Sequence, residues 1–442
     1  MMRHFISRVL STSATHYDVI VVGGGMVGAS TALALADAGK RACVVCAASS
    51  GEPSSSNDLS RLVGVRGSGD PAAAESSVRE FKALEHRSGI RFWQSDAGLL
   101  EVEPSRGMES DYSGLRRLRK RGRQFLSFQE FFGARGFEAR LTEHEHGWIC
   151  PKSYTAACRV AAEVKGGATW LEGRVDRIDG EAGSFEAVTR AGERVRASAV
   201  VLALGAFAPL SPGLFDGLGV SPLPSVMWGK SLYHARLSAR SAANLAAMPP
   251  LLIKPLDGVL PAPAVTYDNA SKAASYVYIF PPIQYPDGHH YLKVGHSPYD
   301  PIIASLGAGA EASELSPPCA EQVHSWYAGG DADAATPIGR DVVECVAHSE
   351  AFFVNVLGKL LTADIEGGHS STCITAKTAS GNALLGELMP GLYQQTGCNG
   401  GGATAALAWG QHVADEVVQG LQPCNVQRPA RNGNSTAGIE PS

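Results

Sequence analysis

Apolar and small residues near the start of the chain follow an order that predicts a strand, a turn, a helix and a second strand. Val19 to Val22 form a short apolar run that is typical of a buried strand. Residues 29–38 are rich in Ala and Leu and end at Gly39, a good helix C-cap. The run RACVVC follows at 41–46 and completes a βαβ pattern.

Three glycines directly after the first strand have the spacing GxGxxG. Gly23 permits a tight turn, Gly25 removes a side chain where a pyrophosphate must approach, and Gly28 lets the helix pack against the strand. Free N–H groups and a partial positive charge at the helix N-terminus favour an anion. The alternative is a tight crossover without a ligand. We interpret the motif as the nucleotide-binding turn of a Rossmann-type domain.

One part of that motif is missing. An Asp or Glu normally ends the second strand and binds the ribose hydroxyls, but Cys46 and Ala47 occupy that position. We therefore expect a serine of the clusters Ser49–Ser50 or Ser54–Ser56 to bind the ribose.

Segments after the glycine turn favour FAD over a nicotinamide cofactor. A polar loop from Ser55 to Arg61 replaces the next βα unit of a nicotinamide dehydrogenase. Later, alternating apolar and polar residues with turns at Gly180 and Gly192 predict an antiparallel excursion. It ends in an apolar strand over 199–204.

This combination resembles the glycine and D-amino-acid oxidase (DAO) family of flavoproteins, and within it monomeric sarcosine oxidase and the fructosyl-amine oxidases. The similarity extends from Tyr17 to about Gly420. It implies an α/β fold with a Rossmann-type FAD-binding domain and a second, mainly antiparallel-sheet substrate domain. The implied FAD-binding segments are 17–97, 148–212 and 362–421, and the implied substrate-domain segments are 98–147 and 213–361.

The resemblance also implies where the cofactor is held. The glycine-rich loop at 396–402 is expected beside the flavin, with the following helix directed at the ring edge that becomes negative on reduction. The expected cofactor-binding residues are Gly23, Gly25, Met26, Val27, Gly28, Ser55, Ser56, Arg61, Val175, Gly205, Cys373, Gly400, Gly401, Gly402 and Thr404.

The segment SSTCITAKTASGNALLGE resembles the sarcosine-oxidase segment in which a cysteine is joined to the flavin by a thioether, and Cys373 occupies that position. Such a bond would anchor FAD covalently and raise its reduction potential. The alternative is an ordinary small buried cysteine.

The segment from Tyr291 to His296 resembles the strand whose lysine faces the flavin and activates dioxygen, which assigns that role to Lys293. A fixed cation about 4 Å from a developing superoxide lowers its energy by roughly 4 kcal/mol at an effective dielectric of 20, or about three orders of magnitude in rate. The alternative is a solvated edge lysine. His296 is a second catalytic candidate that could take the amine proton, although the family histidine matches Ser297.

The carboxylate clamp of sarcosine oxidase is absent. The positions matching its Arg and Lys fall near Gly64 and Thr404, and Thr375 replaces an aromatic residue. Arg66 is the remaining substrate-binding candidate. We therefore expect a small-molecule amine that is larger or less acidic than sarcosine, and a secondary amine in particular.

The leading hypothesis is an enzyme that oxidises the C–N bond of an amine or amino acid. The imine hydrolyses, and dioxygen reoxidises the flavin with release of hydrogen peroxide. The alternatives are a mitochondrial flavin dehydrogenase that reduces a protein or quinone, and a flavoprotein scaffold without turnover.

Length, charge and cysteine content argue against several other classes of protein. The length of 442 residues predicts two or three domains, and a net charge of -5 argues against a chain that coats nucleic acid. The basic run over 116–123 is interpreted as a solvated helix face. Nine scattered cysteines indicate a reducing compartment. No transmembrane segment is expected. His144 with His146, and His289 with His290, have no matching group of Cys or His that would complete a metal site.

The two ends have their own compositions. Residues 1–16 contain Arg3 and Arg8, hydroxyl residues and no acid, which is typical of a mitochondrial transit peptide. The alternative is a disordered leader on a cytoplasmic protein. Residues 422–442 are rich in Pro, Asn, Gly and Ser and are expected to form an unfolded tail.

Overall fold

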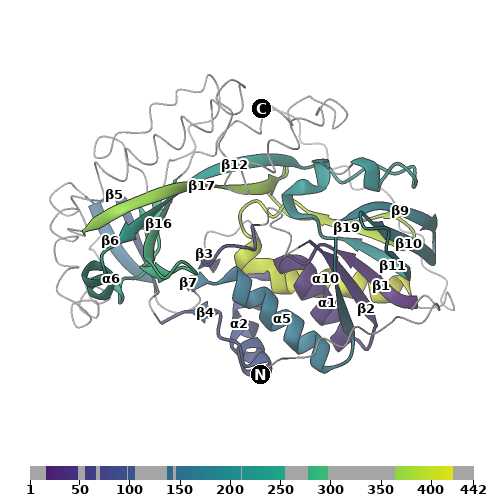
Figure 1. Ribbon diagram of the computed structural model, residues 1–442, viewed down its shortest axis with the longest axis horizontal. Coiled ribbons are helices and arrows are strands. Elements are labelled where there is room, and N and C mark those ends of the chain that lie inside the picture. Colours follow the sequence, from purple (N-terminus) through teal and green to yellow (C-terminus); the bar gives the residue numbers. More distant parts are fainter. Residues whose placement is uncertain are drawn as a thin grey trace, which may run out of the picture.

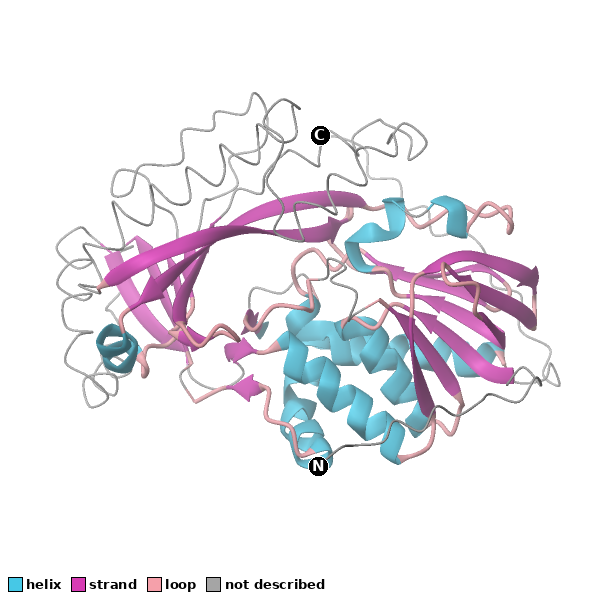
Figure 2. Ribbon diagram, in the orientation of Figure 1, coloured by secondary structure: helices cyan, strands magenta, loops and turns pink. Residues whose placement is uncertain are grey.

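The computed structural model describes nine stretches of the chain: 16–47, 55–65, 70–96, 98–104, 137–142, 146–210, 212–253, 277–296 and 364–421. The predicted transit peptide, apart from His16, and the predicted tail lie outside them. Figures 1 and 2 show a helical layer against one sheet and a second sheet beside it. Among the helices described, none is both long and apolar enough to cross a membrane.

The first sheet contains the predicted βαβ unit. Its strands are β1 (His16–Val22), β2 (Ala42–Cys46), β8 (Ala168–Glu172), β9 (Val175–Glu181), β10 (Ser184–Thr189), β11 (Arg194–Leu202), β18 (Leu384–Met389) and β19 (Leu392–Thr396). The order is β18-β19-β11-β1-β2-β8, and β10 joins β9 to β11. The pairs from β19 to β8 are parallel, whereas β9 and β10 form the predicted antiparallel excursion.

Alternation along β1 buries both faces of this sheet. Val19 and Val21 pack against helices, whereas Ile20 and Val22 pack against the β9–β10 side with Phe185. The helices are α1 (Met26–Asp37), α2 (Pro71–Ser88), α5 (Pro151–Val164) and α10 (Gly402–Gly420). Two-sided burial explains why β1 is a continuous apolar run in the sequence.

The second sheet is mainly antiparallel, as the resemblance implied. Its strands are β5 (Leu99–Pro104), β6 (Phe137–Thr142), β12 (Val226–Leu237), β13 (Leu251–Ile253), β14 (Val277–Ile279), β15 (Ile283–Gln284), β16 (His290–His296) and β17 (Ile365–Lys377). They follow the order β17-β12-β16-β14-β13-β5-β6, with β15 on β16, and only β13 and β5 pair in parallel. Helix α6 (Ala239–Leu245) contacts β12 and β16.

Short elements join the two parts. A third sheet consists of β3 (Arg61–Gly64), β7 (His146–Ile149) and β4 (Trp93–Gln94), in the order β3-β7-β4. The 3₁₀ helices η3 (Gly205–Leu210) and η4 (Pro212–Leu214) follow β11. The long strands β12 and β17 run from the second sheet toward the first (Figure 1), where both contact η3.

Three boundaries differ from the sequence analysis. Helix α1 begins at Met26 because Gly25 is its N-cap, and β11 ends at Leu202 before the turn to η3. Strand β17 falls within the predicted FAD-binding segment 362–421, but its antiparallel ladder with β12 places it in the second sheet. The other domain boundaries stay a prediction.

Candidate cofactor and active site

A cavity of about 310 Å³ lies where β1, β2, β11 and β19 end at their carboxyl edge. This is the edge at which parallel α/β sheets bind ligands. The predicted cofactor residues that line it are Gly23, Gly25, Met26, Val27, Ser55, Ser56, Arg61, Val175, Gly205, Cys373, Gly400 and Gly402. Gly28, Gly401 and Thr404 are not among its lining residues.

The glycine turn has no room for side chains. Gly23 has φ +105°, and a Cβ added there would lie 2.4 Å from the Ala203 carbonyl oxygen. A Cβ at Gly28 would lie 1.9 Å from the Gly23 oxygen. The turn therefore brings the N-terminus of α1 to the cavity with backbone N–H groups exposed to a ligand.

Ser56 contributes to this helix N-terminus. Its Oγ accepts a hydrogen bond of 3.0 Å from the Met26 N–H, and Gly25, the N-cap, has no side chain to do so. Ser55 and Ser56 both line the cavity. A ribose contact from either serine stays a prediction, and Ser49, Ser50 and Ser54 lie outside the described residues.

The end of β2 carries no acid. Cys46 and Ala47 line the cavity there, together with Gly173 and Arg174, and none of the lining residues in the described part of the chain is acidic. Arg174 follows β8, the neighbour of β2. Arg174 was not predicted as a site residue, because no motif marks it and it lies far from the glycine turn in sequence.

The second sheet supplies the opposite wall. Cys373, on β17, is buried, and its Sγ lies 3.5 Å from Arg61 Nη2 and 3.9 Å from Ser55 Oγ. Arg61 Nη2 also donates to the Ser55 carbonyl oxygen at 2.7 Å. Cys373 and the loop that carries Ser55 and Arg61, two parts of the sequence about three hundred residues apart, therefore meet at one end of the cavity.

Lys293 lies behind this end of the cavity and does not line it. The side chain is 1% exposed, and Leu292 and Val294 are buried too, so the alternative of a solvated edge lysine is wrong. Its Nζ donates to Asp58 Oδ2, to the Ser60 carbonyl oxygen at 2.7 Å and to Ser60 Oγ at 3.4 Å. Burial and the Arg61 guanidinium lower the pKa of Lys293 to about 8, against the opposing effect of Asp58.

Asp58 connects the two cations. Its Oδ2 accepts from both Lys293 and Arg61, and its Oδ1 accepts from the Tyr285 hydroxyl at 3.1 Å. Burial opposes ionisation, but Lys293 and Arg61 outweigh it and hold the pKa of Asp58 well below its usual range. No motif in the sequence assigned Asp58 a role.

Two histidines on neighbouring strands of the second sheet form one row with Lys293. His234 pairs with Lys293 on one side and with His369 on the other. The two imidazoles stack with centroids 4.8 Å apart and an interplanar angle of 6°. Burial and the Lys293 charge lower the pKa of His234 to about 3, so this imidazole is neutral at physiological pH.

The glycine-rich loop closes the cavity beside α10. Gly400 and Gly402 line it with Cys398, and Gly401 is the N-cap of α10. Asn399, at φ +49°, is held by its Oδ1, which accepts from the Thr378 N–H at 3.0 Å. The N-terminus of α10 therefore lies at the cavity edge, and its position beside the flavin ring stays a prediction.

Other predicted residues are not tested by this geometry. His296 ends β16 with its backbone opposite Val277, and its side chain lies outside the described part. Arg66, His144 and the basic run over 116–123 lie outside it as well. Within the described residues, no group of three or more His, Cys, Asp or Glu is arranged to hold a metal ion.

The family model of FAD-dependent oxidoreductases, DAO, matches residues 18–416. The chain belongs to the DAO family of FAD-dependent oxidoreductases. The predicted resemblance and fold class are thus confirmed, and FAD is the cofactor of the family. The glycine turn, the two helix N-termini and the cavity flanked by Arg61 and Arg174 fit a dinucleotide with an anionic pyrophosphate.

Solved structures of DAO-like proteins share the fold. The deglycating enzyme fructosamine oxidase from Aspergillus fumigatus (Amadoriase II) is 17% identical, with a TM-score of 0.59, and the match covers 92% of this chain and 87% of that chain. Glycine oxidase from Geobacillus kaustophilus is 20% identical, with a TM-score of 0.56 and coverages of 91% and 95%. L-proline dehydrogenase from P. horikoshii is 18% identical, with a TM-score of 0.58 and coverages of 92% and 94%. No curated protein matches the chain in sequence.

Proposed function

We propose that this DAO-family protein oxidises the C–N bond of an amine or amino acid to an imine, which then hydrolyses. The observation that carries the proposal is the cavity itself. It joins the GxGxxG turn of the first sheet to the Cys373 wall of the second sheet. FAD bound there supplies hydride acceptance, and the protein supplies binding, orientation and charge.

The residues around the cavity have separable tasks in this function. The N-termini of α1 and α10 present backbone N–H groups, which bind phosphate oxygens at one end and stabilise negative charge at the other. Arg61 adds a permanent cation beside Cys373. A group that becomes negative in the cavity is therefore stabilised without proton transfer.

The substrate is proposed to be a secondary amine or amino acid. The fructosamine oxidase, glycine oxidase and L-proline dehydrogenase named above support an amine, because each name states an amine or amino acid as the compound acted on. The positions near Gly64 and Thr404 carry no charge for a two-point carboxylate clamp. This favours an amine that is larger or less acidic than sarcosine, with Arg66 as the proposed carboxylate contact.

Dioxygen is the proposed electron acceptor, with hydrogen peroxide as the product. A second candidate is a dehydrogenase that reduces a protein or quinone. It is favoured by one observation: the Lys293 ammonium is held by Asp58 and Ser60 and does not line the cavity. Turnover with dioxygen compared with turnover with an artificial dye separates the two.

Covalent attachment of the flavin through Cys373 is part of the proposal. Its sulfur is buried at the cavity wall beside Arg61.

An anaerobic screen tests the function. Holoenzyme is mixed without oxygen with secondary amines and amino acids, and flavin absorbance is followed. Bleaching by at least one amine, with formation of the corresponding carbonyl product, is expected. Protein that stays colourless after refolding with FAD, or a flavin that no amine bleaches, would contradict the proposal.

A further inference from the structure

Two cations and one carboxylate form a buried cluster next to the Cys373 end of the cavity. Arg61, Asp58 and Lys293 have side chains that are 18%, 15% and 1% exposed. Both cations contact the same oxygen of Asp58. The cluster therefore has a net charge of one positive when Lys293 is protonated.

The contacts of Lys293 leave its charge turned away from the cavity. An ammonium group has three hydrogens, and three acceptors surround Nζ: Asp58 Oδ2, the Ser60 carbonyl oxygen and Ser60 Oγ. The ring of Phe280 lies under the same nitrogen, at 5.0 Å from its centroid. Arg61 is the member of the cluster that lines the cavity.

Asp58 is fixed from several sides. Its Oδ1 accepts from the Leu59 N–H at 2.6 Å and from the Tyr285 hydroxyl at 3.1 Å, while Oδ2 receives both cations. A carboxylate held in this way cannot turn to release Lys293 without breaking all of these contacts. Its negative charge also offsets one of the two positive charges near the cavity.

We propose that Asp58 is a positioning residue that holds the Lys293 ammonium against Ser60 and lowers the electrostatic potential at the Cys373 end of the cofactor cavity. Anions in that part of the cavity respond to the summed charge of Arg61, Asp58 and Lys293, not to Lys293 alone. Asp58 thereby limits the rate at which reduced flavin reacts with dioxygen, the proposed electron acceptor. The inference rests on the proposed FAD function and extends it to reoxidation of the flavin.

The link to dioxygen is electrostatic. In the net reaction, anionic reduced flavin would give two electrons and its N5 hydrogen to dioxygen, and one proton from the buffer would complete hydrogen peroxide and leave oxidised flavin. The first electron makes dioxygen an anion, and sulfite is an anion that adds to oxidised flavin. Both events become more favourable as the local potential becomes more positive.

Three variants give a charge series. Lys293→Met leaves a cluster charge of zero, Asp58→Asn leaves two positive charges while Lys293 is protonated, and the double variant restores one. Photoreduced holoenzyme is mixed with oxygenated buffer at pH 6, and the sulfite dissociation constant is measured on the oxidised form. We expect about tenfold faster reoxidation and about tenfold tighter sulfite binding in Asp58→Asn, the opposite shifts in Lys293→Met, and wild-type values in the double variant.

The pH profile adds a readout that a purely structural role would not change. The ionisable groups around Lys293 are Arg61 and Asp58 from the loop and β3, Tyr285 before β16, His234 from β12, and His369 and Cys373 from β17. In Asp58→Asn, sulfite affinity should fall as pH rises from 6 to 8, because an unpaired buried ammonium loses its proton more readily. In the wild type Lys293 has a pKa of about 8, so its loss of charge should begin only toward the upper end of this range, and the ratio of the variant affinity to the wild-type affinity should fall between pH 6 and pH 7.5.

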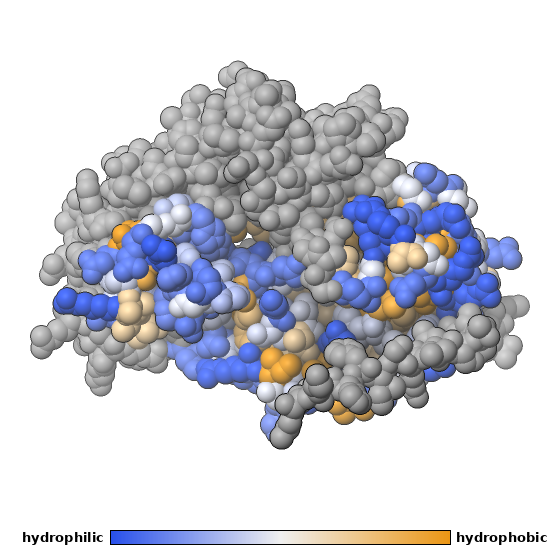
Figure 3. Space-filling model, in the orientation of Figure 1, coloured by the Kyte–Doolittle hydropathy of each residue, from blue (hydrophilic) through white to orange (hydrophobic). Residues whose placement is uncertain are grey.

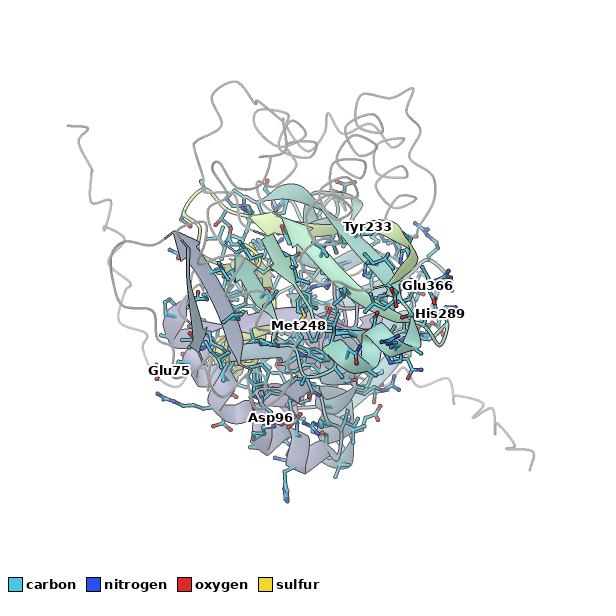
Figure 4. All side chains as sticks on the ribbon, turned by 90° about the vertical axis from the view of Figure 1, so that its left-hand side faces the viewer. Glu75, Asp96, Tyr233, Met248, His289 and Glu366 are labelled. Carbon is cyan, nitrogen blue, oxygen red and sulfur yellow. The ribbon has the colours of Figure 1, made fainter. Side chains whose placement is uncertain are left out.

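The decisive comparison is between the double variant Asp58→Asn/Lys293→Met and Lys293→Met alone. It can be made even when Asp58→Asn alone does not fold. Equal, low oxygen rates in these two would show that Lys293 acts directly and would overturn the inference. Unchanged values in Asp58→Asn would overturn it too. Glu75→Gln removes an exposed charge on α2, on the opposite side of Figure 4 from His289 and Glu366, and is the control. Photoreduction needs no substrate, so a failed amine screen and a failed charge series remain distinguishable.

Discussion

At the residue scale, the position of Cys373 makes its covalent link testable. Its sulfur is buried at the cavity wall, whereas Cys398 lines the cavity from the glycine-rich loop, where burial raises the pKa of its thiol. We predict that acid precipitation leaves the yellow colour with the protein, and that Cys373→Ser releases it to the supernatant. Cys398→Ser is the matched control and should keep the colour in the pellet. Colour in the wild-type supernatant would contradict the thioether.

The conformation of Gly23 gives a second residue-scale prediction. Its φ of +105° and the Ala203 oxygen, 2.4 Å from the Cβ that alanine would bring, leave no place for a side chain. Gly23→Ala should lower the free energy of unfolding by about 2 kcal/mol or more and weaken FAD binding by at least about tenfold, measured by urea unfolding and FAD titration. Gly39→Ala, where an added Cβ meets nothing within 4 Å, should cost only about 1 kcal/mol. Equal losses of unfolding free energy in Gly23→Ala and Gly39→Ala would show that the backbone moves to accommodate the added Cβ, and would contradict the prediction.

Residues whose role depends on local spacing could be predicted from the sequence. Gly23, Gly25 and Gly28 lie within six consecutive positions, so a motif specifies them. Asp58 and Arg174 could not be predicted. The role of Asp58 arises from its contact with Lys293, 235 positions away, and Arg174 reaches the cavity because β8 pairs with β2. Long-range ion pairs leave no periodic signal in one sequence.

At the element scale, one side chain joins two helices. Asp70 caps α2 by accepting from the Ala73 N–H at 3.1 Å and accepts from Trp409 Nε1 of α10 at 3.0 Å. Because both bonds are lost, Asp70→Ala should lower the free energy of unfolding by about 2 kcal/mol, measured by urea denaturation. Asp70→Asn keeps an acceptor for the cap and should lose less than half as much. A fully stable alanine variant would rule out this role.

Helices and strands were predictable where the pattern of apolar residues within the element specifies its type. The apolar run of β1 and the Ala-rich sequence of α1 specify a buried strand and helix by themselves. The pairing of β17 with β12 was not predictable, because both strands are long and their partner depends on register over more than a hundred residues. That same register places His369, His234 and Lys293 in one row.

At the scale of the whole molecule, charge and polarity divide between surface and interior. On the face shown in Figure 3, the described residues are mainly hydrophilic, and exposed ion pairs such as Arg194 with Glu186 contribute little to stability. The cluster around Asp58 and Lys293 is different, because the Lys293 side chain is 1% exposed and the Asp58 side chain 15%. It couples the loop after the first βα unit to the second sheet.

This burial predicts how the stability of the whole molecule depends on pH. His234 is 4% exposed, and burial and Lys293 lower its pKa from 6.5 to about 3. The unfolded chain therefore binds a proton at this site that the folded protein does not, between about pH 6.5 and pH 3. Since stability rises with pH wherever the unfolded state binds more protons, the free energy of unfolding should fall as pH drops through this window, by at most about 5 kcal/mol from this group.

Asp58 sets the lowest pH at which the pH dependence of stability can be measured without its own contribution. Its pKa is held below its ordinary value, so its stabilising contribution is complete above about pH 5 and is lost as the pH falls through the folded-state value. Urea unfolding of the protein between pH 5 and pH 7.5 therefore reports the two stacked histidines without Asp58: the buried His234, and the half-buried His369, whose pKa burial also lowers. His234→Phe keeps a ring against His369 and should flatten the slope over this range, whereas His289→Phe, at an exposed position, should retain it. Parallel slopes in the wild type and His234→Phe would mean that this imidazole takes up a proton in the folded protein, and that the row beside Lys293 tolerates a second positive charge.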